Sequence, residues 1–343
     1  MTLMQKEILQ SPDVIKKVLD TNMDTSFHIA EGIAKKTNIF IAARGTSDHA
    51  AIYGKYVLEN MLGKPVGLAA PSVSTVFSRD VDYSDSVFFG ISQSGEAEDV
   101  KLVLQSAKKS GAYTVAITNN ENSALANAAH EHINLCAGAE KSVAATKTFT
   151  ASLFAMAMLG AVYAKDDNLL ASLELVPEEL QKVLVLDSYI KDISQRYRFM
   201  ESCFTLSRGY DYSIAFEAAL KMQECAYVKA KAYSMSDFLH GPIAMIENNT
   251  PCFAYLGKGR FSGDMKDILS RIKKGGADIT VFSDDDDLLC MSDVKIKLPK
   301  IIHEILAPIY IAPAAQLFAC YLSLTKGLSP DTPRGLSKVT ITV

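Results

Sequence analysis

Two stretches of this 343-residue sequence repeat each other at a nearly constant separation. IFIAARGTSDHAAIYGKYVLEN resembles CFTLSRGYDYSIAFEAALKMQE, and the match aligns Arg44 with Arg208, 164 residues later. Further on, AKKSGAYTVAITN (107–119) resembles IKKGGADITVFSD (272–284), 165 residues later. Because both pairs keep the same separation to within one residue, we predict a tandem duplication, that is, a chain built from two copies of one fold.

Each copy alternates short runs rich in Val, Ile and Phe with longer helical patterns. The expected strands lie near 38–43, 66–69, 86–91, 113–118 and 131–135 in the first copy and near 202–207, 252–256, 278–282 and 294–298 in the second. Strands that alternate with helices form parallel sheets covered on both faces. We therefore predict an α/β protein of two tandem doubly wound, flavodoxin-like domains, whose ligands would lie beyond the carboxyl ends of the strands.

The length of the chain suits two domains with short additions. The segments that we expect are an N-terminal helical segment (1–30), a first domain (31–167), a helical connector (168–200), a second domain (201–328) and a C-terminal loop (329–343). The last helical pattern, 302–326, contains Pro308 and Pro313, so we expect a kink or a break there.

Composition limits the classes of function. The net charge of −4, a pI near 5.9 and the absence of any Lys/Arg run argue against a nucleic-acid surface. Six cysteines are scattered singly, which favours small core residues with reduced thiols in a cytosolic protein over disulfides or metal ligands. The first residues lack the apolar region of a signal peptide. The apolar run 149–164 is shorter than a membrane span, so it predicts a buried helix and no membrane partner.

A turn rich in hydroxyl groups follows the apolar run 86–91. In FFGISQSGEAEDV the chain passes from strand to predicted helix through Ser92, Gln93, Ser94 and Gly95. Free backbone N–H groups and the positive end of a helix dipole face outward at such a junction, and this environment suits a phosphate monoester. The alternative is that Ser92 or Ser94 merely caps the helix.

Two more hydroxyl-rich turns in the first copy favour the phosphate interpretation. Gly45, Thr46 and Ser47 follow the neighbouring strand, and SVAATKT (142–148) opens the long apolar helix. At the corresponding strand end the second copy reads YLGKGR (255–260), without a Ser/Thr cluster. We therefore expect the first copy to bind a phosphate and the second copy to serve another purpose.

The second copy carries a set of charged residues on one helix instead. Glu217, Lys221 and Glu224 in FEAALKMQE are spaced i, i+4 and i+7, so they share one helix face. An exposed ion-paired stripe is one interpretation. The rest of that helix is apolar or small nearly all round, which favours burial beside a polar cavity. His240 in SDFLHGP and Lys338 in PRGLSKVTITV are further candidates, although alone each is more typical of an ordinary loop residue.

Together these motifs resemble the sugar isomerase (SIS) family, in particular the isomerase portion of glucosamine-6-phosphate synthase and the stand-alone glucosamine-6-phosphate deaminases. The stretches that carry the resemblance are MQKEILQSP, RGTSDHA, ISQSGEAEDV, VAATKTFT, FEAALKMQECAYVKAKAY, DFLHGP and PRGLSKVTITV. The resemblance implies an enzyme without cofactor or metal that acts on a small sugar phosphate.

The resemblance also implies roles for single residues. The substrate- and phosphate-binding set would be Gly45, Thr46, Ser47, Ser92, Gln93, Ser94, Val143 and Ser337. Glu224 would move a proton between C1 and C2 of the sugar, with Lys221 as its partner and Glu217 supporting the same face. His240 would open the pyranose ring and would come from the second subunit of a homodimer. Lys338 would close over the sugar and could form an imine with the open-chain ketose.

Two departures from the synthase pattern shape the expected reaction. Ala97 stands where that pattern has a hydroxyl residue, and DFLHGP replaces ELKHGP, which is closer to the stand-alone deaminases. Met1 is followed by no early cysteine, so we expect no glutaminase and no ammonia drawn from glutamine. The expected reaction is therefore hydrolytic: an amino-sugar 6-phosphate, most simply glucosamine-6-phosphate, becomes fructose-6-phosphate and ammonia.

Three alternatives stay open at this point. One is a deglycase of a fructosamine-type 6-phosphate, and another is a ketose–aldose isomerase that releases no amine. The third is a non-catalytic sugar-phosphate sensor. The two copies, and the retention of Glu224, Lys221 and His240, count against the sensor, because binding alone does not require a base.

Overall fold

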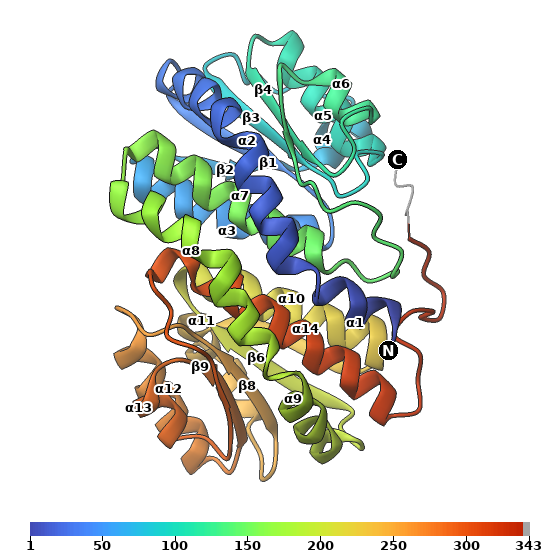
Figure 1. Ribbon diagram of the computed structural model, residues 1–343, viewed down its shortest axis with the longest axis vertical. Coiled ribbons are helices and arrows are strands. Elements are labelled where there is room, and N and C mark those ends of the chain that lie inside the picture. Colours follow the sequence, from blue (N-terminus) through green and yellow to red (C-terminus); the bar gives the residue numbers. More distant parts are fainter. Residues whose placement is uncertain (339–343) are drawn as a thin grey trace. The chain divides into compact units, whose positions relative to one another are not determined.

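The computed structural model describes residues 1–338, which form two compact units (Figure 1). Unit 1 consists of Met1–Leu9, Lys141–Thr146 and Glu178–Gly335. Unit 2 consists of Gln10–Glu140, Lys147–Pro177 and the described residues from Leu336 onward. Each unit contains one copy of the duplicated fold, together with short segments from elsewhere in the chain.

Unit 2 is built on a parallel five-stranded sheet in the order β2-β1-β3-β4-β5. Its strands are β1 (Asn38–Ala42), β2 (Val66–Leu68), β3 (Ser86–Ile91), β4 (Tyr113–Thr118) and β5 (Glu131–Asn134). Its helices are α2 (Ser11–Ala34), α3 (Thr46–Leu62), α4 (Pro71–Thr75), α5 (Glu98–Lys109), α6 (Ala124–Ala128), α7 (Lys147–Ala164) and the first part of α8 (Asp167–Leu184). All six residues of β3 are buried, because helices cover both faces of a central parallel strand.

Unit 1 repeats this architecture in the order β10-β9-β8-β6-β7, again all parallel. Its strands are β6 (Ser202–Ser207), β7 (Lys229–Ser234), β8 (Pro251–Tyr255), β9 (Asp278–Ser283) and β10 (Val294–Lys297). Its helices are α1 (Leu3–Ile8), α9 (Asp187–Ser194), α10 (Tyr212–Ala226), α11 (Met235–Leu239), α12 (Ser262–Lys274), α13 (Asp286–Cys290) and α14 (Ala307–Thr325), with short 3-10 helices η1 (Gln195–Tyr197), η2 (Gly209–Asp211), η3 (Pro242–Met245) and η4 (Glu304–Leu306).

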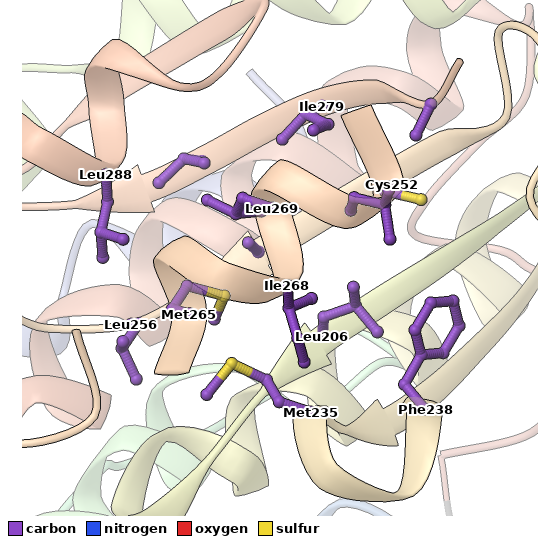
Figure 2. Close-up of a cluster of buried hydrophobic side chains, with 14 of the residues drawn as sticks. Leu206, Met235, Phe238, Cys252, Leu256, Met265, Ile268, Leu269, Ile279 and Leu288 are labelled. Atoms are coloured by element: carbon purple, nitrogen blue, oxygen red, sulfur yellow. The ribbon is translucent and has the colours of Figure 1, made fainter. Parts of the chain in front are cut away.

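In the core of unit 1, an amphipathic helix packs its apolar face on one side of the sheet. Figure 2 shows Met265, Ile268 and Leu269 of α12 facing apolar side chains of the strands, among them Leu206 and Ile279. All five are buried, with Ile268 the most exposed at 3%. Spacing of i, i+3 and i+4 puts the three helix residues on one face, which explains why this charged helix packs on a sheet.

The duplication predicted from the sequence is confirmed by the two sheets. Both have the flavodoxin-like strand order, and each strand of unit 2 has a counterpart in unit 1. A side-chain pair is also repeated. The Nε of Arg44 lies 2.6 Å from the Oδ2 of Asp99, and the Nη1 of Arg208 lies 2.5 Å from the Oδ2 of Asp264. The predicted α/β fold class is therefore correct.

Three local expectations differ from the structure. Strand β7 was missed, because KAKAYS alternates lysines with small residues and has no Val or Ile. Helix α14 continues through Pro313 without a break, and Pro308 lies in its first turn, where no amide hydrogen is needed. Helix α5 begins only at Glu98, and its N-cap is Ala97. Neither Ser92 nor Ser94 therefore caps it.

Two helices in the described part of the chain are long and apolar enough to cross a membrane by length and composition. They are α7, whose 18-residue window is 89% buried inside the protein, and the segment Glu304–Thr325, whose window is 100% buried. Such burial is typical of core helices. The run 149–164 therefore forms the buried helix that its composition predicts.

Candidate active site

Helix α10 of unit 1 carries the three charged residues that the spacing singled out. The Nζ of Lys221 lies 2.6 Å from the Oε2 of Glu224 and 3.5 Å from the Oε1 of Glu217. The side chains of Lys221 and Glu217 are 0% and 1% exposed, whereas that of Glu224 is 23% exposed. The three residues are therefore not an exposed stripe. They form a buried ion triad in which Glu224 is the carboxylate open to solvent.

The triad sets the charge state of its lysine. Burial by itself would lower the pKa of Lys221, but the charges of Glu217 and Glu224 and the hydrogen bond to Glu224 raise it above the ordinary value. Lys221 is therefore an ammonium group at neutral pH. This ammonium group lies 2.6 Å from the Oε2 of Glu224, the partly exposed carboxyl group of the triad.

Cys225 follows Glu224 on α10 but has the properties of a core residue. Its side chain is buried, and burial raises the pKa of its thiol to about 12. The thiol is therefore protonated at neutral pH and is a poor nucleophile. The expectation that the cysteines are core residues is confirmed for the four buried ones, whereas Cys136 is half-buried and Cys290 is exposed.

His240 ends the short helix α11, which Ser234 caps by accepting a hydrogen bond from the amide of Asp237. Gly241 follows with φ +148°, a conformation that side chains rarely adopt, and η3 begins at Pro242. This turn leaves the imidazole exposed. Together with Arg208, His240 lines a cavity of about 300 Å³ in unit 1.

The turn after β3 in unit 2 has its own internal hydrogen bonds. The Oγ of Ser92 accepts from the amide of Gly95 at 3.2 Å, and the Oγ of Ser94 accepts from the amide of Glu96 at 3.2 Å. Within residues 1–338, the backbone N–H groups of Gln93 and Ser94 have no protein acceptor. Ser92 is buried and Ser94 half-buried, so the turn presents two amide donors and hydroxyl groups at the sheet edge.

Glycine is required at the end of this turn. Gly95 has φ +73°, and a Cβ built there would lie 2.1 Å from the Oγ of Ser123. The carbonyl of Gly95 also accepts from the amide of Leu125, which ties the turn to α6. Both backbone conformation and close packing therefore exclude a side chain at position 95.

The second hydroxyl-rich turn follows β1, the strand that pairs with β3. Gly45, with φ +54°, is the N-cap of α3, and Thr46 and Ser47 begin that helix. The ion pair between Arg44 and Asp99 joins the start of α3 to the start of α5. Because parallel strands end at the same edge, the turns at Ser47 and at Ser92 lie at one edge of the sheet.

The third turn, 142–148, is arranged differently. Its hydroxyl group at Thr148 donates to the Oε2 of Glu140 at 2.9 Å, and the Thr148 amide donates to the Oε1 of the same residue at 3.2 Å. The Oγ of Ser142 is buried and has no hydrogen-bond partner among the described residues. Val143 is half-buried, and residues 141–146 belong to unit 1.

Glu140 is a residue that sequence reasoning missed. Its side chain is 0% exposed, and its Oε2 lies 2.9 Å from the Nζ of Lys338. Lys338 is therefore held by an ion pair rather than fully solvated, while Ser337 beside it is exposed. The sequence did contain a signal for Glu140, which is the single carboxylate in the small-residue stretch CAGAEKSVAATKT. A charge that is buried among small residues needs a partner.

The second copy closes the turn that corresponds to SQSG with its own acidic side chains. The amide of Gly257 donates to Asp211 at 2.9 Å, that of Lys258 to Asp284 at 2.7 Å, and that of Arg260 to Glu304 at 3.2 Å. Carboxyl oxygens thus accept from these three amides, so each of them already has a protein partner.

Comparison with known proteins identifies the family. Residues 32–162 and 200–326 match the family model for the SIS domain. The isomerizing glutamine–fructose-6-phosphate aminotransferase of Aquifex aeolicus is 35% identical over 99% of this chain, and the chain spans 57% of that protein's length. The C-terminal domain of glucosamine-fructose-6-phosphate aminotransferase from Francisella tularensis is 28% identical, with a TM-score of 0.89 over 97% of this chain and 98% of that one.

A more distant structure shares the fold alone. The glucosamine-6-phosphate deaminase of Thermotoga maritima is 20% identical, with a TM-score of 0.80 over 99% of this chain and 100% of that one. The two matched segments cover well over half of the sequence. The chain therefore belongs to the SIS family, as the sequence motifs predicted.

Proposed function

We propose that this chain is a phosphosugar isomerase of the SIS family that deaminates an amino-sugar 6-phosphate, most simply glucosamine-6-phosphate, to fructose-6-phosphate and ammonia. The observation that carries the proposal is the ion triad of α10. A permanently charged, buried Lys221 supports a carboxylate, Glu224, that remains accessible to solvent. A purely structural ion pair would not need one partially exposed carboxylate beside a fully buried cation.

The proposed chemistry needs a base that serves two neighbouring carbons. In the open-chain aldehyde, whose amino group is protonated, Glu224 takes the proton from C2, and the electron pair forms the C1=C2 double bond while a proton of the ammonium group passes to the oxygen of C1. The product is an enolamine with the amino group still on C2. Glu224 then returns the proton to C1, which leaves an iminium group at C2. Water adds to that carbon and ammonia leaves, so that fructose-6-phosphate results. One water is consumed and one ammonia is released per turnover.

The other residues have supporting roles in the proposal. The turns at Ser47 and Ser92 in unit 2 hold the phosphate with backbone amides and hydroxyl groups. Thr46, Gln93, Ser94, Val143 and Ser337 complete the binding set. His240 opens the pyranose ring and acts on the substrate of the partner subunit in a homodimer, and Lys338 closes over the open-chain sugar. We place this metabolism in the cytoplasm.

The decisive experiment is a substrate panel. Purified protein is incubated with glucosamine-6-phosphate, and fructose-6-phosphate and ammonia are measured separately. Equal amounts of both products are expected, with Glu201→Gln, an exposed position in unit 1, as active as the wild type. Release of neither product would contradict the proposal.

The same panel separates the alternatives. Turnover of a fructosamine-type 6-phosphate alone would identify a deglycase. Interconversion of a ketose and an aldose phosphate without ammonia would identify a plain isomerase. Synthesis of glucosamine-6-phosphate from fructose-6-phosphate, only when glutamine is present, would identify an aminotransferase like the Aquifex aeolicus relative. Binding without any turnover would leave a sugar-phosphate sensor.

A further inference from the structure

We propose that the short helix α1 is a clasp for the segment 141–146 and for the C-terminal loop, and that Glu7 is the positioning residue that holds the first of them. The inference rests on the proposed function in one respect: the segment 141–146 contains Val143, and the C-terminal loop leads to Lys338. α1 lies beside α14 (Figure 1), and all of the contacts that follow are inside unit 1.

The carboxylate of Glu7 fixes the segment 141–146 at its start. Glu7 is only 5% exposed. Its Oε1 accepts from the backbone amide of Lys141, and its Oε2 accepts from the amide of Ser142 at 3.1 Å. The opposite end of the segment is also held, because the amide group of Gln316 on α14 donates to the carbonyl of Thr146 at 3.2 Å.

The N-terminal end of α1 is joined to the C-terminal loop. The carboxylate of Asp331 accepts from the amides of Leu3 and Met4 at 2.8 and 2.9 Å, so one loop side chain satisfies two of the free N–H groups of this helix. The loop is also held at α10. The amide of Arg334 donates to the hydroxyl of Tyr227 at 2.8 Å, and the Arg334 guanidinium lies 4.0 Å from the centre of the Tyr227 ring.

α1 also contacts the helix that carries the ion triad. The Sγ of Cys225, next to Glu224 on α10, lies 3.8 Å from the Sδ of Met4 and 4.0 Å from the carbonyl oxygen of Pro330. A helix of six residues therefore touches three segments that the proposed function uses. These segments are far apart in the sequence, and the motif MQKEILQSP contains residues 4–8 of α1.

A carboxylate is chemically specific for the position of Glu7. Both of its oxygens face backbone donors, whereas a glutamine would turn an NH₂ group toward one of those donors. The Oε1 of Glu7 also lies 3.3 Å from the Ser142 amide, so a glutamine would leave that buried amide only this longer hydrogen bond, with an NH₂ group facing it. Weakening the hydrogen bond of a buried donor in this way is costly. Glu7→Gln keeps the size of the side chain, so its effect reports on this hydrogen bonding rather than on packing.

Hydrogen exchange of the full-length protein tests the clasp without any substrate. In Glu7→Gln, amide exchange in a peptide covering 141–146 should accelerate by about tenfold or more relative to the wild type, while other peptides of unit 1 stay protected. The matched control is Lys6→Gln, which introduces the same residue at the neighbouring exposed position of α1. Asp331→Asn should instead accelerate exchange in the peptide 329–336.

Kinetics then show whether the clasp positions the site. Glu7→Gln should lower kcat by about tenfold with an unchanged apparent affinity for inorganic phosphate, and Glu7→Asp, which keeps the charge, should restore part of the loss. Unchanged exchange at 141–146 in Glu7→Gln would overturn the clasp. If Glu7→Gln unfolds, equal exchange in Glu7→Asp and wild type would overturn it instead. A wild type inactive on glucosamine-6-phosphate would refute only the proposed function, because the exchange results do not depend on turnover.

Discussion

At the scale of single residues, the properties of α10 come from the unequal burial of three ionisable side chains. Lys221 is fully buried between two carboxylates, and only Glu224 has appreciable exposure. Removing one member of a buried ion group leaves an uncompensated charge, whereas changing the exposed member alters mainly the chemistry. This difference makes Glu224 the position at which activity and stability can be separated.

Glu224→Gln is therefore expected to lower kcat/KM for glucosamine-6-phosphate by about 10²- to 10⁴-fold, the usual contribution of a positioned base. The melting temperature should stay close to that of the wild type, because the amide still accepts a hydrogen bond from Lys221. Steady-state kinetics and a thermal melt check the two parts. A Glu224→Gln enzyme that keeps full activity would exclude Glu224 as the base.

Asp211 gives a prediction about pH. It is buried, its Oδ1 has no hydrogen-bond partner among the described residues, and burial raises its pKa well above the ordinary 3.8. The unfolded chain releases this proton just above pH 3.8, while the folded protein keeps it. The contribution of Asp211 to stability is therefore lost as pH rises above 3.8 toward the folded pKa.

The variant Asp211→Asn removes that dependence. Its melting temperature should exceed that of the wild type at pH 8, and the difference should shrink as the pH falls toward 4. Thermal melts of both proteins over this pH range measure the difference. A constant difference across the range would mean that Asp211 does not titrate with the predicted sign.

At the scale of elements, the turn between β3 and α5 has a backbone conformation that leaves amide groups available as hydrogen-bond donors. Two residues separate this turn from α5, whose N-cap Ala97 has no capping side chain. Ser92 and Ser94 accept hydrogen bonds from amides further along the turn, which stabilises it without using the N–H groups of Gln93 and Ser94. The motif is thus a turn with its own geometry rather than an extension of the helix.

Gly95→Ala should damage this turn selectively. The substitution places a Cβ at φ +73° and 2.1 Å from the Oγ of Ser123. We expect KM for glucosamine-6-phosphate to rise by about tenfold or more with a smaller change in kcat, since the change affects binding of the phosphate. Steady-state kinetics measure both constants.

Gly63→Ala is the matched control for this prediction. Gly63 has a similar φ of +62° at the C-terminus of α3, and an added Cβ there would meet nothing within 4 Å. The two variants therefore share the backbone cost of a left-handed alanine, roughly 1 kcal/mol, and differ in the collision. Equal KM values in both variants would show that the turn at Gly95 does not bind the substrate.

At the scale of the whole molecule, the two copies of the fold differ in the backbone amides that they leave without a protein acceptor in the described residues. Unit 2 keeps two amides without protein acceptors in its described turn, whereas unit 1 satisfies the amides at the same positions after the strand, those of Gly257 and Lys258, with Asp211 and Asp284. The internal symmetry of the chain is therefore structural and not functional.

This divergence predicts one phosphosugar per chain. Isothermal titration with fructose-6-phosphate should give a stoichiometry close to one, and the double variant Ser92→Ala with Ser94→Ala should abolish the heat of binding. A stoichiometry of two, or binding that survives in the double variant, would show that the turn 257–260 also accepts the phosphate.

Much of this molecule was predictable from local patterns. The runs of Val, Ile and Phe predicted nine of the ten strands, and the signal is strongest for a central strand such as β3, which is apolar because it is buried on both faces. Strand β7 was not predicted, because KAKAYS forms a strand by pairing with β6. This pairing is a long-range interaction that the composition of the segment does not indicate. The spacing of Glu217, Lys221 and Glu224 predicted a shared face, since helix periodicity is a local property.

The sequence by itself determined the duplication, the α/β class, the shared face on α10 and the hydroxyl-rich turns, all of which depend on order and spacing along the chain. Only the tertiary structure decided which charges are paired and which are buried. Glu7 holds amides more than 130 residues away, and Glu140 holds Lys338 across almost 200 residues. Burial and pairing depend on which residues folding brings together. For a single polar residue, the neighbouring sequence does not indicate which distant residue will be its partner.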